Sequence, residues 1–167
     1  QDLHSSPSIG ADGTIYVGTS GGLFAVRDDG TSGHVLPGWP VPTTGAIDTA
    51  PSIDGGKVYV SSFLSGTRTV YAIDAGANPP AVLWSVAGPG STTTSFAQTP
   101  SAVIGGNGLV YAAIGRKIYA FDPARPQPAT PVWQHSLPAD AISLALGDGV
   151  LYVSAKNAHL YALVASP

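Results

Sequence analysis

Four histidines are the side chains of this 167-residue sequence best suited to proton transfer or zinc binding. They are His4, His34, His135 and His159, and their wide spacing gives no close ligand pair. No cysteine is present to complete a zinc site or to form a disulfide. We therefore expect surface or turn positions for all four histidines, with no metal site and no catalytic residue among them.

The acidic residues suggest two other kinds of chemistry. Glycoside hydrolysis needs two poised carboxylates, and calcium loops need carboxylates at alternating positions. Asp12, Asp54 and Asp148 each precede Gly, which is typical of turns. Asp28-Asp29-Gly30 is the segment most similar to a calcium loop, but its two carboxylates are adjacent and do not alternate. We predict turn roles for these residues and no cofactor for the chain.

A tyrosine repeat indicates which elements must position these side chains. The first tyrosine of each repeat lies in an apolar segment, and these four tyrosines follow one another at intervals of roughly 40 to 50 residues, the period of a propeller blade. They are Tyr16, Tyr59, Tyr111 and Tyr152. A second aromatic residue follows in each repeat and is itself followed by Ala; this second set is Phe24, Tyr71, Tyr119 and Tyr161. These eight positions hold every tyrosine of the chain.

Each repeat predicts a meander of short antiparallel strands. A Pro-Ser segment opens the first three repeats, a Gly-containing turn follows, and two aromatic strands come next. Both faces of these strands are apolar, as in sheets that pack face to face with their neighbours. Trp39, Trp84 and Trp133 follow the second aromatic residue in the first three repeats and predict a fourth, outer strand. The last repeat has no such tryptophan.

Composition limits the function classes. The chain is 44% hydrophobic with a net charge of −3, its ten acids are all Asp, and its seven Lys and Arg residues are spread along the sequence. No basic stripe is present, so we expect neither nucleic-acid binding nor a polybasic membrane patch. No apolar run approaches the roughly 20 residues of a membrane-spanning helix. Few Lys, no Glu and many Ser, Thr and Gly favour an exported protein, and Gln1 suggests the start of a processed or excised segment.

The repeats resemble the pyrroloquinoline-quinone-type repeat of quinoprotein β-propellers. The resemblance spans essentially the whole chain and is strongest at residues 14–18, at 70–74 with Trp84, and at 118–122 with Trp133. It implies that the tryptophans dock neighbouring blades. The Thr-Gly-Lys turn of the family is absent, because residues 76–78 and 124–126 differ from it. Quinoprotein dehydrogenases of this resemblance have eight blades, a calcium site that includes Glu, and often a vicinal Cys pair. This chain has neither Glu nor Cys.

We therefore predict an all-β chain of about four four-stranded antiparallel blades, a partial or half propeller in one segment, 1–167. The expected blades are 1–43, 44–93, 94–138 and 139–167, the last without its outer strand. The expected function is that of a noncatalytic binding or assembly scaffold, extracellular or periplasmic. Its ligand would be a protein or a glycan on the propeller face or rim, and a homodimer or further blades would complete the ring.

Two alternatives to this scaffold remain open at the level of sequence. The chain could be a fragment of a larger quinoprotein-like dehydrogenase. It could also be a carbohydrate-binding propeller, in which Phe63 and Phe96, the aromatic residues off the repeat pattern, would stack on sugars.

Overall fold

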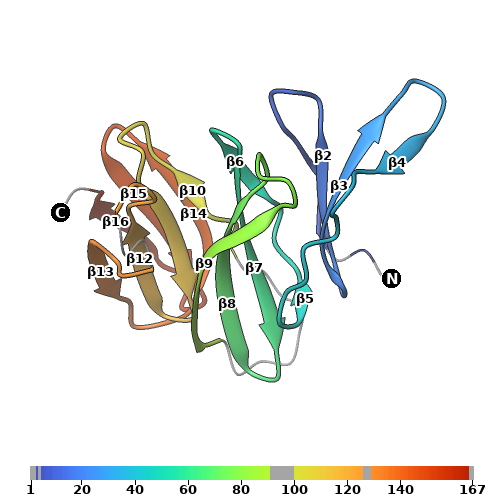
Figure 1. Cartoon of the computed structure of the whole chain (residues 1–167). Helices are drawn as coiled ribbons and strands as arrows, with labels where there is room; N and C mark the ends of the chain where they lie inside the picture. The colour runs from blue at the N-terminus through green and yellow to red at the C-terminus, as the bar shows by residue number, and fades with distance from the viewer. Residues whose placement is uncertain (1–2, 4, 91–99, 126–128, 166–167) are drawn as a thin grey trace.

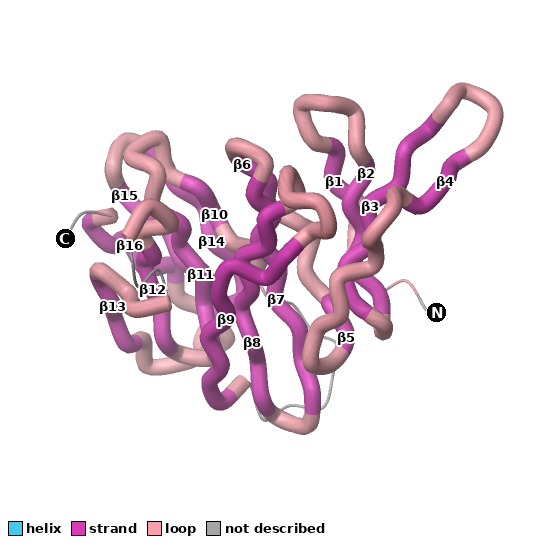
Figure 2. The backbone as a smooth tube through the Cα atoms, viewed as in Figure 1, coloured by secondary structure: helices cyan, strands magenta, loops and turns pink. Residues whose placement is uncertain are grey.

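The computed structural model describes residues 3, 5–90, 100–125 and 129–165, and these residues form sixteen β-strands and no helix. The strands make four antiparallel sheets in chain order, which stand side by side like the leaves of a fan (Figure 1). Turns and loops join the strands at the upper and lower ends of the sheets (Figure 2). The all-β, propeller-like arrangement predicted from the repeats is confirmed, and within the described residues the array is open.

The first sheet is a four-stranded meander in the order β1-β2-β3-β4. Its strands are β1 (Ser8–Ile9), β2 (Ile15–Thr19), β3 (Gly22–Asp28) and β4 (Gly33–Val35). The turn between β1 and β2 contains Gly13 at a φ of 81°, a left-handed conformation that Gly adopts without steric cost. The Asp-Gly dipeptide in the sequence therefore marks the hairpin turn that it predicts.

The second sheet has five strands because its inner edge is divided in two. Both short strands, β5 (Ala46–Ile47) and β6 (Ser52–Asp54), pair with β7 (Lys57–Leu64), which continues to β8 (Thr67–Asp74) and β9 (Ala81–Pro89). The hairpin between β7 and β8 is strand almost to its tip, since pairing extends to Leu64 and Thr67.

The third and fourth sheets repeat the meander. The third has the order β10 (Val103–Ile104), β11 (Val110–Ile114), β12 (Lys117–Phe121), β13 (Trp133–Ser136). The fourth has three strands among the described residues: β14 (Ala141–Gly147), β15 (Val150–Ala155) and β16 (Leu160–Val164).

Three apolar clusters between adjacent sheets form the core. The first and second sheets enclose one cluster, the second and third another, and the third and fourth the last. All five residues of β11 are buried, as expected for a strand that packs on both faces. Ala25, Ala72 and Ala120, which follow the second aromatic residue of their repeats, are at most 1% exposed. Their small side chains occupy the tightly packed spaces between sheets.

The three tryptophans pack where the resemblance placed them. Trp84 on β9 is buried between the second and third sheets, with its ring 6.3 Å from that of Tyr59 and 4.9 Å from that of Phe121. Trp39 meets Tyr16 edge-on at 5.6 Å, and Trp133 packs against the cluster between the third and fourth sheets.

The prediction that each tryptophan lies in an outer strand is wrong for the first sheet. There the outer strand is β4, which ends at Val35. Trp39 follows it, next to a turn whose Gly38 has a φ of 82°, and Val41 then makes an isolated bridge to Leu23. Gly38 and the two prolines on either side of Val41 explain the difference, because Pro cannot donate a ladder hydrogen bond.

Candidate functional site

The two ends of the sheets differ in charge. Seven carboxylates lie in or beside the upper turns of the described residues: Asp12, Asp28, Asp29, Asp54, Asp74, Asp122 and Asp148. Three cations accompany them there, namely Arg27, Lys57 and Arg125. The lower end reverses this balance, with Arg68, Arg116, Lys117 and Lys156 against Asp48 and Asp140. The described part of the molecule is therefore electrically polar along its strands, acidic above and basic below.

Much of the lower-end charge surrounds one cavity, which we call the lower pocket. Its volume is about 700 Å³, and strands and turns of the second, third and fourth sheets line it. Arg116 and Lys117 come from the β11–β12 turn, and Lys156 comes from the equivalent turn between β15 and β16. Asp140 is the acidic residue of the wall. Three of the seven Lys and Arg residues of the chain thus converge on this pocket.

Backbone hydrogen bonds fix the walls of the lower pocket. The amide of Ala141 donates to the Gly115 carbonyl at 3.0 Å, and the amide of Lys156 donates to the Asp140 carbonyl at 2.9 Å. The Lys156 ammonium lies 3.6 Å from the Asp140 carboxylate, with both side chains about three-quarters buried. Gly88, Gly90 and Gly115 form part of the lining, so the backbone itself is accessible there. This arrangement provides cations and amide groups on a fixed frame, which is suited to holding an anionic ligand.

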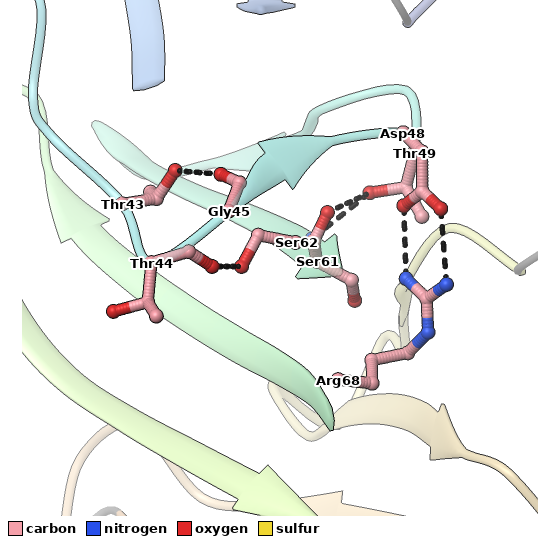
Figure 3. Close-up of polar contacts among 8 residues, drawn as sticks. All are labelled: Thr43, Thr44, Gly45, Asp48, Thr49, Ser61, Ser62 and Arg68. Atoms are coloured by element: carbon pink, nitrogen blue, oxygen red, sulfur yellow. Dashed lines mark hydrogen bonds and ion pairs between the residues drawn. The ribbon is translucent and has the colours of Figure 1, made fainter. Parts of the chain in front are cut away.

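A buried polar cluster braces the lower end of the second sheet (Figure 3). The Arg68 guanidinium donates to both Asp48 carboxylate oxygens, at 2.8 and 3.0 Å. Ser62 donates to the Thr44 carbonyl at 2.6 Å, and the Ser61 amide donates to the Thr49 hydroxyl at 2.9 Å. These bonds attach the loop around β5 to β7 and β8. The cluster is a structural support, because its charges satisfy one another.

The turn carboxylates are bound within their own loops. Asp29 accepts hydrogen bonds from the amides and hydroxyls of Thr31 and Ser32, and these bonds lower the pKa of its carboxyl. Asp28 accepts from the Gly30 amide. Asp12 accepts from Thr14, which is the main reason that its pKa is lowered, and it also pairs with Arg27 at 3.0 Å. These bonds account for the turn geometry that the sequence predicts.

The structure does not bring the described histidines together. His34 and His135 are exposed on the outer strands β4 and β13, and His159 is exposed in the turn before β16. His4 lies outside the described residues. Within the described residues, no three histidine or acidic side chains converge as metal ligands would.

The two aromatic candidates for sugar stacking have different outcomes. Phe63 is half-buried on β7, and the Arg68 guanidinium lies 5.3 Å from its ring centre and covers one face. Phe96 lies outside the described residues. A glycan ligand therefore stays a prediction without a specific contact to support it.

Sequence reasoning missed Arg116, Lys117, Asp140 and Lys156. Their common signal is positional, since the three cations lie in or beside the turn that joins the two aromatic strands in repeats three and four.

Residues Gly18 to Gly22 have the Gly-x-Ser-x-Gly spacing of a nucleophile elbow. They form the tight β2–β3 hairpin turn here, whereas such elbows join a strand to a helix. No helix in the described residues is long and apolar enough to cross a membrane.

Solved structures place the fold among β-propellers. BamB from Moraxella catarrhalis superposes with a TM-score of 0.69 at 20% identity, over 98% of this chain and 47% of BamB. The chain thus spans about half the length of that protein. The computationally designed Ika4 protein matches with a TM-score of 0.66 at 14% identity, over 99% of this chain and 92% of Ika4. A europium-containing methanol dehydrogenase matches with a TM-score of 0.50 at 16% identity, over 66% of this chain and 20% of the enzyme.

At these identities the structural matches describe the fold alone. A comparison with curated protein sequences finds no match. The family profile described as outer membrane protein assembly factor BamB matches residues 2–127, which is well over half of the sequence. The tyrosine repeats, the tryptophans packed between sheets and the profile match all indicate the same family. The chain therefore belongs to the BamB family of pyrroloquinoline-quinone-type repeat propellers.

Proposed function

We propose that the chain is a noncatalytic protein-binding scaffold that acts outside the cytoplasm, and that the lower pocket is its binding site. Family membership supports the scaffold role, because the matching profile is described as an assembly factor. The observation that carries the assignment of the site is the convergence of Arg116, Lys117 and Lys156 from two neighbouring sheets on one cavity.

The chemistry of the pocket favours an acidic, extended segment of a partner protein. Cations attract carboxylates over distances of about 10 Å at moderate ionic strength. The pocket, at about 700 Å³, is large enough for several side chains, and its glycines let a partner backbone approach closely. The acidic upper end would repel the same segment, so the polarity of the molecule also orients the partner.

A direct binding experiment tests the pocket. The probe is a fluorescein-labelled hexaglutamate peptide, with hexalysine as its opposite, and fluorescence anisotropy measures binding at low and at physiological salt. We expect hexaglutamate to bind, more weakly at higher salt, and Arg116→Ala/Lys117→Ala to reduce its affinity at least tenfold. The matched control is Lys57→Ala/Arg125→Ala, which removes the same charge at the upper end.

Equal loss of affinity in the two double variants would show attraction to net charge only and would contradict the pocket. Binding that survives Arg116→Ala/Lys117→Ala would contradict it as well. For the location, fractionation of the native cell with an antibody to the chain is decisive. Recovery in the cytosolic fraction would overturn the proposal that the protein is exported.

A further inference from the structure

Each interface between two adjacent sheets, which we call a seam, joins two unlike faces. We call the side of a sheet that carries the first tyrosine of its repeat the Tyr face, and the opposite side the Val face. The Tyr face of the first sheet packs on the Val face of the second, and the pattern continues from the second to the third and from the third to the fourth. In the first seam, Tyr16 and Leu23 meet Val58 and Val60.

The fourth sheet presents a Tyr face that no described residue covers. Tyr152 is 41% exposed, whereas its equivalents Tyr16, Tyr59 and Tyr111 are 7%, 2% and 0% exposed. Leu160 and Val164 lie on the same face and are 70% and 71% exposed. The equivalents of Leu160 are Leu23, Val70 and Ile118, all fully buried.

The first sheet presents the complementary Val face. Val17, Phe24 and Val26 line an apolar groove of about 370 Å³ there, together with Leu3 and Thr19. Leu3 bridges Thr19 on β2, just as Ile47 pairs with Ser62 on β7. These two side chains are therefore repeat equivalents, yet Leu3 is 70% exposed while Ile47 is fully buried in the first seam.

We propose that two copies of this chain pair head to tail, with the Tyr face of each fourth sheet packed on the Val face of the other copy's first sheet. Leu160 and Tyr152 would bury against Val17 and Phe24, and Leu3 would take the place that Ile47 takes in the first seam. The argument is continuity with an existing interface, because each end face is one half of a seam that the chain already builds three times.

Two such contacts related by a two-fold axis close a ring, whereas a single repeated contact would give an open filament. One copy covers 47% of the BamB chain, so two copies have about the length of that propeller. The pairing is independent of the ligand proposed for the lower pocket, since no residue that lines the lower pocket lies on an end face.

Light scattering coupled to size exclusion tests the proposal on the chain of residues 1–167. We expect twice the chain mass of 16.8 kDa for the native sequence. A pair of identical copies has two end contacts, so each substitution places an aspartate in both of them. Leu160→Asp and Leu3→Asp should therefore each give the monomer mass. Leu83→Asp is the matched control, since Leu83 is 43% exposed but lies on β9, in the middle of the array. This variant should keep the mass of the pair. Circular dichroism checks that every variant folds.

A mixture of the two end variants gives the sharpest result. The Leu3→Asp copy keeps an intact Tyr face and the Leu160→Asp copy keeps an intact Val face. A mixed pair therefore has one native contact and one that carries both substitutions, and equal amounts should form pairs through the native contact that neither variant forms alone. A native chain that stays monomeric overturns the proposal, and the end faces would then be expected to pack on further sheets of a longer chain. A filament, or a mixture that stays monomeric, overturns it too.

Discussion

The guanidinium of Arg68 and the carboxylate of Asp48 form a two-pronged ion pair that is almost closed to water. The side chains are 8% and 10% exposed, and the two hydrogen bonds are 2.8 and 3.0 Å long. Removal of one partner from a buried pair leaves an uncompensated charge, whereas removal of both can be nearly neutral. The pair therefore fixes the loop around β5 without being the main source of stability.

The first prediction follows from this burial. Arg68→Met should lower the free energy of unfolding by about 3 kcal/mol, and Arg68→Met/Asp48→Leu should recover most of the loss. Urea denaturation measures both. Arg27→Met is the control, because the Arg27–Asp12 pair is 44% and 61% exposed and should contribute less than about 1 kcal/mol. Similar losses in Arg68→Met and Arg27→Met would show that the burial has no energetic effect.

The second prediction concerns the first seam. A Cβ atom on Gly18 would lie 2.3 Å from Cγ2 of Ile47, which is fully buried and cannot move aside. Gly18→Ala should therefore cost about 1–3 kcal/mol through overpacking. Ile47→Ala should relieve the part of the clash that Cγ2 makes, while Cβ of residue 47 stays 2.6 Å from the added atom. The double variant should therefore be more stable than the sum of the two single losses predicts.

Gly106→Ala is the matched control for this test, because no heavy atom lies within 4 Å of the position that an added Cβ would take at Gly106. The backbone there is also outside the left-handed region. Strict additivity of the Gly18 and Ile47 losses in urea denaturation would contradict the contact.

The sequence predicts the repeating parts of this fold well, and physical reasons explain why. Tyr16, Tyr59 and Tyr111 recur because each fills the same space between two sheets, so one constraint appears three times in the chain. The Gly of each first turn is likewise required by backbone geometry, as at Gly13 and Gly108, whose φ angles are 81° and 78°. Repetition makes these local rules visible in a single sequence.

The lower pocket could not be predicted in the same way. Arg116 and Lys156 come from different repeats, and they line one cavity because the third and fourth sheets pack against each other. The Arg68–Asp48 pair depends on the path of an irregular loop, for which no repeat rule exists. The end of β4 at Val35 was missed because Gly38 and two prolines interrupt the pattern that the other outer strands follow.

The third prediction is a loss of stability at alkaline pH. Burial raises the pKa of Tyr59 to about 12, and the negative charge of Asp54 adds to the effect. A tyrosine in the unfolded chain titrates near 10. The unfolded state therefore loses this proton first, and stability should fall as the pH rises from about 10 to about 12. Tyr59→Phe should remove roughly 2 kcal/mol of that fall at pH 12.

Urea denaturation at several pH values from neutral to strongly alkaline measures this difference. An unchanged slope in Tyr59→Phe would mean that the phenol is accessible to water.

The fourth prediction concerns the hydroxyl that ties the last strand to the third sheet. The Tyr111 hydroxyl donates to the carbonyl of Ala165 and accepts a hydrogen bond from the Asn107 side chain at 3.3 Å. Both Tyr111 and Ala165 are buried, so Tyr111→Phe would leave the Ala165 carbonyl without its donor. We expect a loss of about 1–2 kcal/mol.

Hydrogen exchange locates that loss. Amides of β16 that pair with β15 should exchange faster in Tyr111→Phe, while those of β2 and β3 should keep their native rates, because two seams separate the first sheet from the altered contact. Tyr161→Phe serves as the control, since the hydrogen bond that the Tyr161 hydroxyl accepts from the Asn157 side chain is exposed to solvent. Uniformly faster exchange in all four sheets would instead indicate a global loss of stability, and Tyr111 would then act on the whole array through packing and not through its bond to Ala165.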